Sequence, residues 1–242
     1  MLQLPWLEPH STLFPPTDRA LVEPNGLLAA GGDLSEQRLL SAYRQGIFPW
    51  FSDGEPILWW TPSPRMVLFP DKLHISRSLR KTLRQKTFQV TINHCFADVI
   101  QACAEPRPEV SEEKRGTWIT DTLKNAYINL HHSGYAHSIE VWDESKLAGG
   151  LYGVAIGKIF FGESMFSQMS NTSKIALVYL TEQVKKWGYQ LIDCQVYSDH
   201  LYSLGAETIE RSKFEAIIHH FAGKKIVYEN WQPAEITGLI LT

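Results

Sequence analysis

HSIEVWDESKLAGGLYGVAIGKIFFGESM, residues 137–165, decides the fold, because apolar side chains alternate there with polar or small ones. A period of two is typical of β-strands that bury one face. The alternation is interrupted at residues 143–146 and around Gly157, where turns are expected. The pattern predicts three strands of an antiparallel meander: His137–Trp142, Leu147–Val154 and Lys158–Met165.

Helical periodicity lies on both sides of this meander. Apolar residues at helical spacing predict a long helix at Thr172–Trp187, and a short apolar strand follows at Leu191–Val196. Upstream, Asn93 and Thr120 are expected to begin helices, and the last expected helix covers Phe214–Phe221. Strands adjacent in sequence with helices before and after them are typical of the α+β class. The sequence therefore predicts a mostly antiparallel sheet flanked by helices.

The N-terminal quarter has a different composition. Ten of the 13 prolines fall at or before Pro70, and four of the eight tryptophans lie in the first 60 residues. So many prolines exclude long helices and central strands. One short helix is predicted after Ser35, which can cap it, with Gly46 beyond its end. We therefore expect a small Pro/Trp-rich N-terminal domain over residues 1–63 and a second domain over residues 64–242.

Composition excludes several classes of protein. With 23 Lys and Arg against 26 Asp and Glu, the net charge is −3, so the chain is not a uniformly basic nucleic-acid coat. No apolar run reaches the roughly 20 residues of a membrane helix, and the first residues lack the features of a signal peptide. The three cysteines and nine histidines show no metal-ligand spacing, and no heptad repeat is present. We expect a cytoplasmic monomer with no membrane partner and no metal.

An acid lies inside the apolar strand LIDCQV, residues 191–196. Because side chains alternate along a strand, Asp193 and Gln195 are expected on one face and Cys194 on the other. This arrangement argues against Cys194 as a nucleophile paired with a histidine and favours a small buried side chain there. A buried acid needs a partner. Asp193 is therefore either a member of a structural salt bridge or a functional residue.

A second acid, Glu163, ends the third predicted strand in FFGESMFS. Glu163 and Met165 can face one pocket, and Gly162 would let a ligand approach the backbone closely. Glu163 would there bind a cationic group, and the structural alternative is an ion pair with a Lys or Arg of the chain. Trp50 and Trp118 lie in or beside loops. Each is either a core residue or a wall on which a base or an aromatic side chain stacks.

Positive charge is concentrated in HISRSLRKTLRQK, residues 74–86, which contains no acid. At helical spacing most of these cations share one broad stripe. A solvated helix surface normally mixes both signs, so the phosphate backbone of a nucleic acid is the expected partner. The candidate nucleic-acid contacts are Arg77, Arg80, Lys81, Arg84 and Lys86.

Seven segments, in order along most of the chain, resemble the leucyl/phenylalanyl-tRNA-protein transferase family. They are PNGLLAAGGDLS, GIFPWFSDGEPILWWTPSPR, HISRS, EKRGTWIT, HSIEVW, GGLYGVAIGKIFFGESMFS and the LGAE that follows LIDCQV. Two departures from the family pattern are visible. Residues 104–115 form a longer loop than usual, and Leu151 stands where Met is expected, which keeps an apolar pocket apolar.

The resemblance implies an N-acetyltransferase-like (GNAT-like) fold for the second domain and an aminoacyltransferase that needs no cofactor. It implies transfer of Leu or Phe, and less readily Met, from aminoacyl-tRNA to the α-amino group of proteins that begin with Arg or Lys. This modification would mark them for degradation by the N-end rule pathway. The family's RNA-binding cluster falls on residues 77–86, and its pocket residues fall on Trp50, Trp118, Gly162, Glu163, Met165, Asp193 and Gln195.

An aminoacyl ester is an activated acyl donor, so proximity of the donor and the amine could supply most of the rate. We expect Asp193 to accept or orient a proton of the amine and Gln195 to fix the amine and the ester carbonyl. Met165 and Leu177 are expected to form an adaptable slot for the donor side chain, and Glu163 to hold the acceptor's basic side chain.

Two other functional classes stay open. An acyl-CoA-dependent N-acetyltransferase would need a glycine-rich loop before the long helix, and the segment SQMSNTSK at that place contains no glycine. A non-catalytic RNA-binding module would use the basic helix alone. Such a module would not need an acid and an amide on one face of a buried strand.

Overall fold

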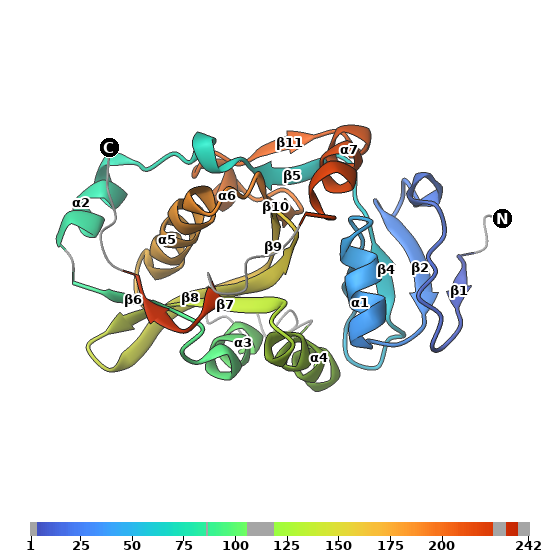
Figure 1. Ribbon diagram of the computed structural model, residues 1–242, viewed down its shortest axis with the longest axis horizontal. Coiled ribbons are helices and arrows are strands. Elements are labelled where there is room, and N and C mark those ends of the chain that lie inside the picture. Colours follow the sequence, from blue (N-terminus) through green and yellow to red (C-terminus); the bar gives the residue numbers. More distant parts are fainter. Residues whose placement is uncertain (1–3, 86, 106–118, 225–230, 237–242) are drawn as a thin grey trace.

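The computed structural model describes residues 4–85, 87–105, 119–224 and 231–236, which Figure 1 shows as a ribbon. The predicted meander is present as β7 (Ala136–Asp143), β8 (Lys146–Ile156) and β9 (Ile159–Ser167). Ile139 lies opposite Leu151, which in turn lies opposite Met165, so the three strands have the expected antiparallel order.

The meander is the centre of an eight-stranded sheet with the order β11-β5-β10-β9-β8-β7-β6-β12. The strands that extend it are β5 (Arg65–Leu68), β6 (Gln89–Ile92), β10 (Leu191–Gln195), β11 (Glu207–Ile209) and β12 (Ala234–Glu235). β9 and β10 are parallel, and every other neighbouring pair of described strands in this sheet is antiparallel. The chain is therefore α+β with a mostly antiparallel sheet, as predicted.

Helices cover both faces of this sheet, as Figure 1 shows. They are α2 (Arg77–Gln85), α3 (Phe96–Ala104), α4 (Asp121–His132), α5 (Thr172–Lys186), α6 (Asp199–Tyr202) and α7 (Arg211–Phe221). Tyr152 and Phe161 belong to a core that they share with α3 and α4. Leu151 and Phe160 belong to a second core that they share with α5 and α2. The alternation along β8 and β9 thus separates two cores.

The N-terminal residues form a second, four-stranded sheet with the order β1-β2-β4-β3. Its elements are β1 (Trp6–Leu7), β2 (Leu27–Gly31), α1 (Glu36–Tyr43), β3 (Phe48–Pro49) and β4 (Leu58–Trp60), and single 3-10 turns occur at Thr17–Arg19 and Pro70–Lys72. Trp59 and Tyr43 share one continuous core with Phe161 and Phe214 of the larger part. The division into domains 1–63 and 64–242 stays a prediction.

The helix predicted from Thr172 does begin there. Of the three residues expected to cap or begin the other helices, two do so and one does not. Ser35 and Thr120 each accept a hydrogen bond from the backbone N–H three residues further on. Asn93 does not begin a helix, because its backbone is left-handed, with φ of 57°. Its side-chain amide donates to the carbonyl of Trp231, and its side-chain oxygen accepts from the backbone N–H of Ser138. Asn93 therefore joins neighbouring segments instead of capping α3.

Candidate functional site

A cavity opens where β9 and β10 separate. The two strands pair in parallel only where Leu191–Asp193 lie beside Ile159–Phe161, although β9 continues to Ser167. Beyond that point, residues of both strands line a cavity of about 970 Å³. Its wall includes most of the pocket residues selected from the sequence, namely Gly162, Glu163, Met165, Leu177, Asp193 and Gln195.

Two irregularities direct the polar side chains of this cavity. Gly153 of β8 lies opposite Gly162, but the register then shifts so that Glu163 is an extra residue in β9. The pairing of β5 with β10 shifts before Gln195, whose φ of 63° is left-handed. The side-chain amide of Gln195 consequently donates to Glu163 Oε1 at 2.8 Å, across the gap between the two strands.

Glu163 is buried, and three donors hold its carboxylate. Tyr43 on α1 donates its hydroxyl to Oε1 at 2.8 Å, and Tyr127 on α4 donates to Oε2 at 2.7 Å. Gln195 is the third donor. Among the described residues no Lys or Arg forms an ion pair with Glu163, so the structural alternative proposed for it is not observed.

Neither tyrosine was predicted from the sequence to belong to the site. Their only signal was a hydroxyl on an otherwise apolar helix face, where it needs a partner.

Burial raises the pKa of Glu163 from 4.5 to about 7, although the hydrogen bonds from Tyr127 and Tyr43 act in the opposite direction. The neighbouring charge of Asp193 also raises this pKa, and the hydrogen bond from Gln195 lowers it. Burial raises the pKa values of Tyr43 and Tyr127 well above 10, so both hydroxyls keep their protons. The cavity wall thus contains a carboxyl group that exchanges its proton near neutral pH.

The raised pKa makes folding stability depend on pH. Between pH 4.5 and 7 the folded protein binds more protons at Glu163 than the unfolded chain, so this group's contribution to stability falls as pH rises. The free energy of unfolding of the wild type minus that of Glu163→Gln is expected to fall by roughly 3 kcal/mol between about pH 4 and about pH 8. Urea titrations at each pH measure this difference, in which the other titrating groups cancel. A difference that rises with pH would contradict the raised pKa.

Asp193 is held by a buried ion pair. Arg65 Nε donates to Oδ1 at 2.8 Å and Arg65 Nη2 to Oδ2 at 2.7 Å, and both side chains are fully buried. The guanidinium carbon lies 4.8 Å and 4.6 Å from the ring centroids of Phe48 and Phe214. Asp193 Oδ1 also accepts the backbone N–H of Gln195. The salt-bridged alternative for Asp193 is therefore the observed arrangement, and its role as a proton acceptor stays a prediction.

The cavity combines apolar and acidic side chains. Leu177 on α5 and Met165 on β9 both line it. Neither Lys nor Arg is among the described residues of its wall, whereas Glu105, Glu163 and Asp193 are. Because Arg65 neutralises Asp193, the remaining acids are Glu105 and Glu163. The wall therefore suits ligands that combine an apolar side chain with a positive charge.

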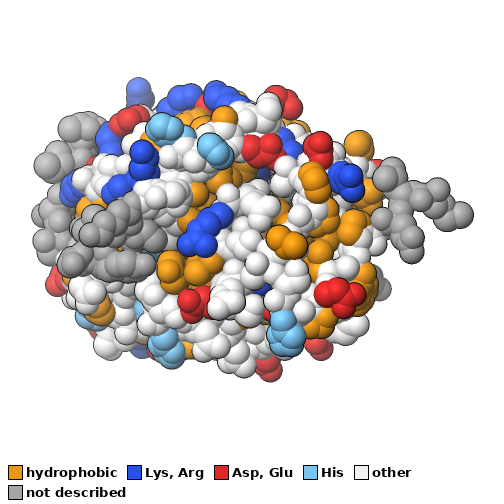
Figure 2. Space-filling view, turned by 45° about the vertical axis from the view of Figure 1, so that its right-hand side comes forward, with side chains coloured by type: hydrophobic (Ala, Val, Ile, Leu, Met, Phe, Trp, Pro, Cys, Tyr) orange, Lys and Arg blue, Asp and Glu red, His pale blue; other side chains and the backbone are white. Residues whose placement is uncertain are grey.

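The structure describes only one of the two tryptophans selected from the sequence. Trp50 is not among the described residues that line the cavity, and 42% of it is exposed. Its ring lies 5.6 Å from that of Trp60, measured between centroids. Figure 2, in which the right-hand side of Figure 1 comes forward, shows hydrophobic side chains on the face that it presents. Trp118 lies outside the described residues.

Cysteine and histidine side chains are dispersed. Cys194 packs against the core of α5, on the face opposite Asp193 as expected, and burial raises the pKa of its thiol. Across the described ranges, no three side chains of His, Cys, Asp or Glu are placed to hold a metal ion. None of the helices in the described part of the chain is both long and apolar enough to cross a membrane.

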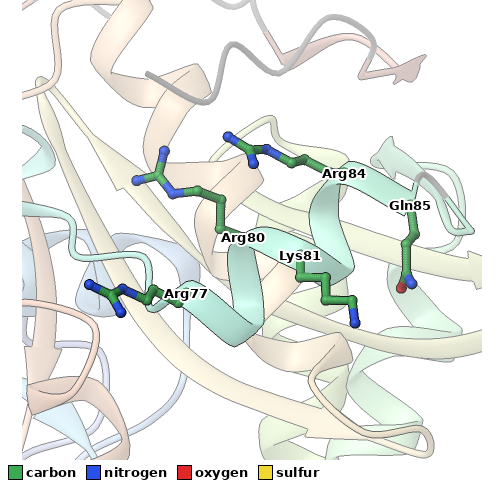
Figure 3. A pocket seen from close by; sticks show the side chains of 5 residues that line it. All are labelled: Arg77, Arg80, Lys81, Arg84 and Gln85. Carbon is green, nitrogen blue, oxygen red and sulfur yellow. The ribbon is translucent and has the colours of Figure 1, made fainter.

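The predicted basic helix is α2, which Leu79 and Leu83 anchor to the core. Figure 3 shows Arg80 and Arg84 pointing to one side of the helix and Lys81 to the other. A shallow hollow of about 350 Å³ lies among Arg77, Arg80, Lys81, Arg84 and Gln85. No acid is among the described residues that line it, so the positive charge is concentrated there. Lys86 lies outside the described residues.

Comparisons with known proteins give consistent results. A family profile described as leucyl/phenylalanyl-tRNA protein transferase matches residues 67–219, and one described as the N-terminal domain of that transferase matches residues 32–63. Curated relatives with the same description include that of Nitrosomonas europaea, which is 61% identical over 203 residues, or 84% of each chain. The relative from Cellvibrio japonicus is 56% identical over 90% of this chain and 91% of its own.

Among the solved structures that match, one is a distant relative. L-PGS from Bacillus licheniformis aligns with 86% of this chain and 64% of its own length, at 13% sequence identity and a TM-score of 0.39. A score this low supports no conclusion about the fold.

Proposed function

The chain belongs to the leucyl/phenylalanyl-tRNA protein transferase family. From this premise we propose which proteins accept the transferred amino acid and which residues of the enzyme bind the two substrates. The enzyme is an aminoacyltransferase that moves Leu or Phe from aminoacyl-tRNA to proteins. We propose that the acceptors begin with Arg or Lys, that Met is a poorer donor, and that the product is a degradation signal of the N-end rule pathway. The acidic cavity wall, without Lys or Arg among its described residues, carries this proposal.

In this proposal the apolar residues of the cavity bind the donor side chain and its polar residues bind the acceptor terminus. The aminoacyl ester is already activated, so holding it beside the amine supplies most of the rate enhancement. Met165 and Leu177 receive the donor side chain, and an adaptable apolar slot selects only weakly between Leu and Phe. Gln195 and the carboxylates of Glu105 and Glu163 attract and orient the positively charged acceptor terminus.

The tRNA body binds to α2 in this proposal. The hollow among Arg77, Arg80, Lys81 and Arg84 offers several cations to a phosphate backbone. Trp50 and Trp118 remain our candidates for stacking on the terminal adenosine. We also propose a cytoplasmic monomer, because charged tRNA is a cytoplasmic substrate, and a GNAT-like class for residues 64–242, which the mostly antiparallel sheet between two helix layers supports.

The structure favours this function over the two alternatives. An acyl-CoA donor carries several phosphate charges, whereas the described cavity wall contains acids and no Lys or Arg, and no glycine precedes α5 in residues 167–174. A non-catalytic RNA-binding module would account for α2, but not for the polar network around Glu163 at the wall of the cavity.

One assay separates the three functions. Labelled Phe-tRNA or labelled acetyl-CoA is incubated with the enzyme and a peptide that begins with Arg. We expect label from Phe-tRNA on the α-amine, little label on a matched peptide that begins with Ala, and none on an N-acetylated peptide. Label from acetyl-CoA alone would establish the acetyltransferase, and no label from either donor would leave the RNA-binding module. Equal labelling of the Arg and Ala peptides would overturn the proposed acceptor specificity.

A further inference from the structure

Three oxygen-to-oxygen contacts join Glu163, Tyr43 and Tyr127 in a closed ring. The two hydroxyl oxygens are 2.5 Å apart, Tyr43 lies 2.8 Å from Oε1, and Tyr127 lies 2.7 Å from Oε2. Each contact needs one proton to be a hydrogen bond, and a tyrosine hydroxyl has only one. With Glu163 ionised, the ring holds two protons for three contacts.

A third proton on Glu163 completes the ring. The protonated carboxyl then donates to Tyr43, Tyr43 donates to Tyr127, and Tyr127 donates to the second carboxyl oxygen. In the ionised state both hydroxyls donate to the carboxylate, and the contact between the two hydroxyl oxygens lacks a proton. The geometry of the ring therefore accommodates one more proton. Burial of the carboxyl group favours this protonated state, whereas the hydrogen bonds that Tyr127 and Tyr43 donate to the carboxylate favour the ionised one.

We propose that the ring of Glu163, Tyr43 and Tyr127 accepts the proton that the acceptor's α-ammonium group releases during aminoacyl transfer. This inference rests on the proposed function, because it needs an amine and an aminoacyl ester in the cavity. In the reaction the amine nitrogen forms a bond to the ester carbonyl carbon, and the bond from that carbon to the tRNA 3′-oxygen breaks. The ammonium nitrogen loses two protons, of which one goes to the 3′-oxygen and one to Glu163. Glu163 returns its proton to water after the products leave.

The neighbouring groups support this assignment. The charge of Asp193 is balanced by the guanidinium of Arg65 within a fully buried pair, whereas all three donors to Glu163 are neutral. Gln195 links the two sites, because its backbone N–H contacts Asp193 and its side-chain amide contacts Glu163. Both acids line the cavity, but only Asp193 is paired with a cation, so Asp193 is a positioning residue that fixes Gln195 and Glu163 is the proton acceptor.

Titration of the free enzyme tests the ring without any substrate. The Glu163 carboxyl carbon is observed by ¹³C NMR in protein labelled at glutamate, and its signal is assigned as the one that Glu163→Gln removes. We expect Tyr43→Phe and Tyr127→Phe each to lower the pKa of Glu163. The protonated ring loses two hydrogen bonds, whereas the ionised form loses one and is also relieved of the contact at 2.5 Å between two hydroxyl oxygens that no proton joins. If the tyrosines act only as donors to an ionised carboxylate, either variant raises this pKa, and a rise or no change overturns the proposal.

Tyr152→Phe is the matched control. The Tyr152 hydroxyl is buried and interacts electrostatically with Glu163, and it has no hydrogen-bond partner among the residues that the structure describes, so it lies outside the ring. Its removal is expected to change the pKa of Glu163 much less than either ring variant. An equal change in all three tyrosine variants would show a general effect of burial and would overturn the ring.

Transfer kinetics test whether Glu163 accepts the proton of the amine. The acceptor amine is mostly protonated at about pH 7 and mostly neutral at about pH 9. In single turnovers with Phe-tRNA and an Arg-initiated peptide, we expect Glu163→Gln to lose about threefold more rate at the lower pH than at the higher, because about half of Glu163 already carries its proton at pH 7. An equal loss at both pH values overturns the proposal, and Tyr127→Phe is assayed in parallel in case Glu163→Gln does not fold. If the wild type transfers no label, the proposed function fails, and the titration still decides whether the ring exists.

Discussion

Replacing Asp193 by alanine is expected to lower the free energy of unfolding by about 3–5 kcal/mol, because it leaves the buried guanidinium of Arg65 without its counter-ion. Arg65 is fully buried between two aromatic rings, and its Nη1 has no hydrogen-bond partner in the described part of the chain. The variant also removes the acceptor for the backbone N–H of Gln195, whose left-handed conformation places its side chain on Glu163. Urea unfolding monitored by tryptophan fluorescence measures the loss.

The ion pair between Lys72 and Glu207 provides a matched control for this prediction. It also joins the β5 side of the sheet to β11, with a distance of 2.7 Å between Lys72 Nζ and Glu207 Oε1, but both side chains are exposed. Exposed pairs contribute little, so Glu207→Ala is expected to cost about 0–1 kcal/mol. Similar losses in Asp193→Ala and Glu207→Ala would contradict the argument from burial.

A double variant separates the structural role of Asp193 from a chemical one. Replacing both members of a buried ion pair by apolar residues avoids the unpaired charge, so Arg65→Met with Asp193→Leu is expected to recover most of the lost stability. If turnover at saturating substrates recovers as well, Asp193 serves stability alone and is needed neither for the chemistry nor for positioning Gln195. If the stable double variant stays inactive while the position of Gln195 is unchanged by NMR, Asp193 takes part in the chemistry.

Local patterns predicted the elements that carry the site. Alternation in residues 137–165 predicted the three meander strands, and the cap at Thr120 predicted the start of α4. These signals act over a few residues, so they need no knowledge of the tertiary structure. The strand LIDCQV and its acid were recognised for the same reason.

The contacts of the site depend on residues distant in sequence. Arg65 lies 128 positions from Asp193, and Tyr43 lies 120 positions from Glu163. No periodicity connects such pairs, because they meet only when β5 joins β10 and α1 packs against the larger sheet. The bulge at Gln195 was also not predicted, because the alternation of side chains does not reveal a glutamine whose backbone is in the left-handed conformation. Asn93 was misassigned for a related reason, because a residue that favours helix caps also tolerates the left-handed region.

Neutralising the four described cations of α2 is expected to weaken tRNA binding by a factor that depends steeply on salt. Each phosphate contact releases counter-ions, so four contacts contribute about 3 to 4 units to the slope of log affinity against log salt. Over a change from about 50 to about 200 mM salt, that share of the slope corresponds to roughly a 100-fold change in affinity. The variant combines Arg77→Gln, Arg80→Gln, Lys81→Gln and Arg84→Gln, and leaves Leu79 and Leu83 to hold the helix in place.

Fluorescence anisotropy with labelled tRNA at several salt concentrations measures this slope. The control variant, Lys146→Gln with Lys213→Gln, removes exposed cations that do not line the hollow of α2 and is expected to leave the slope nearly unchanged. Because phosphate contacts carry no sequence information, the quadruple variant should weaken tRNA(Leu), tRNA(Phe) and an unrelated tRNA by the same factor. An unchanged slope, or a loss confined to one tRNA, would show that α2 is not an electrostatic surface for the tRNA backbone.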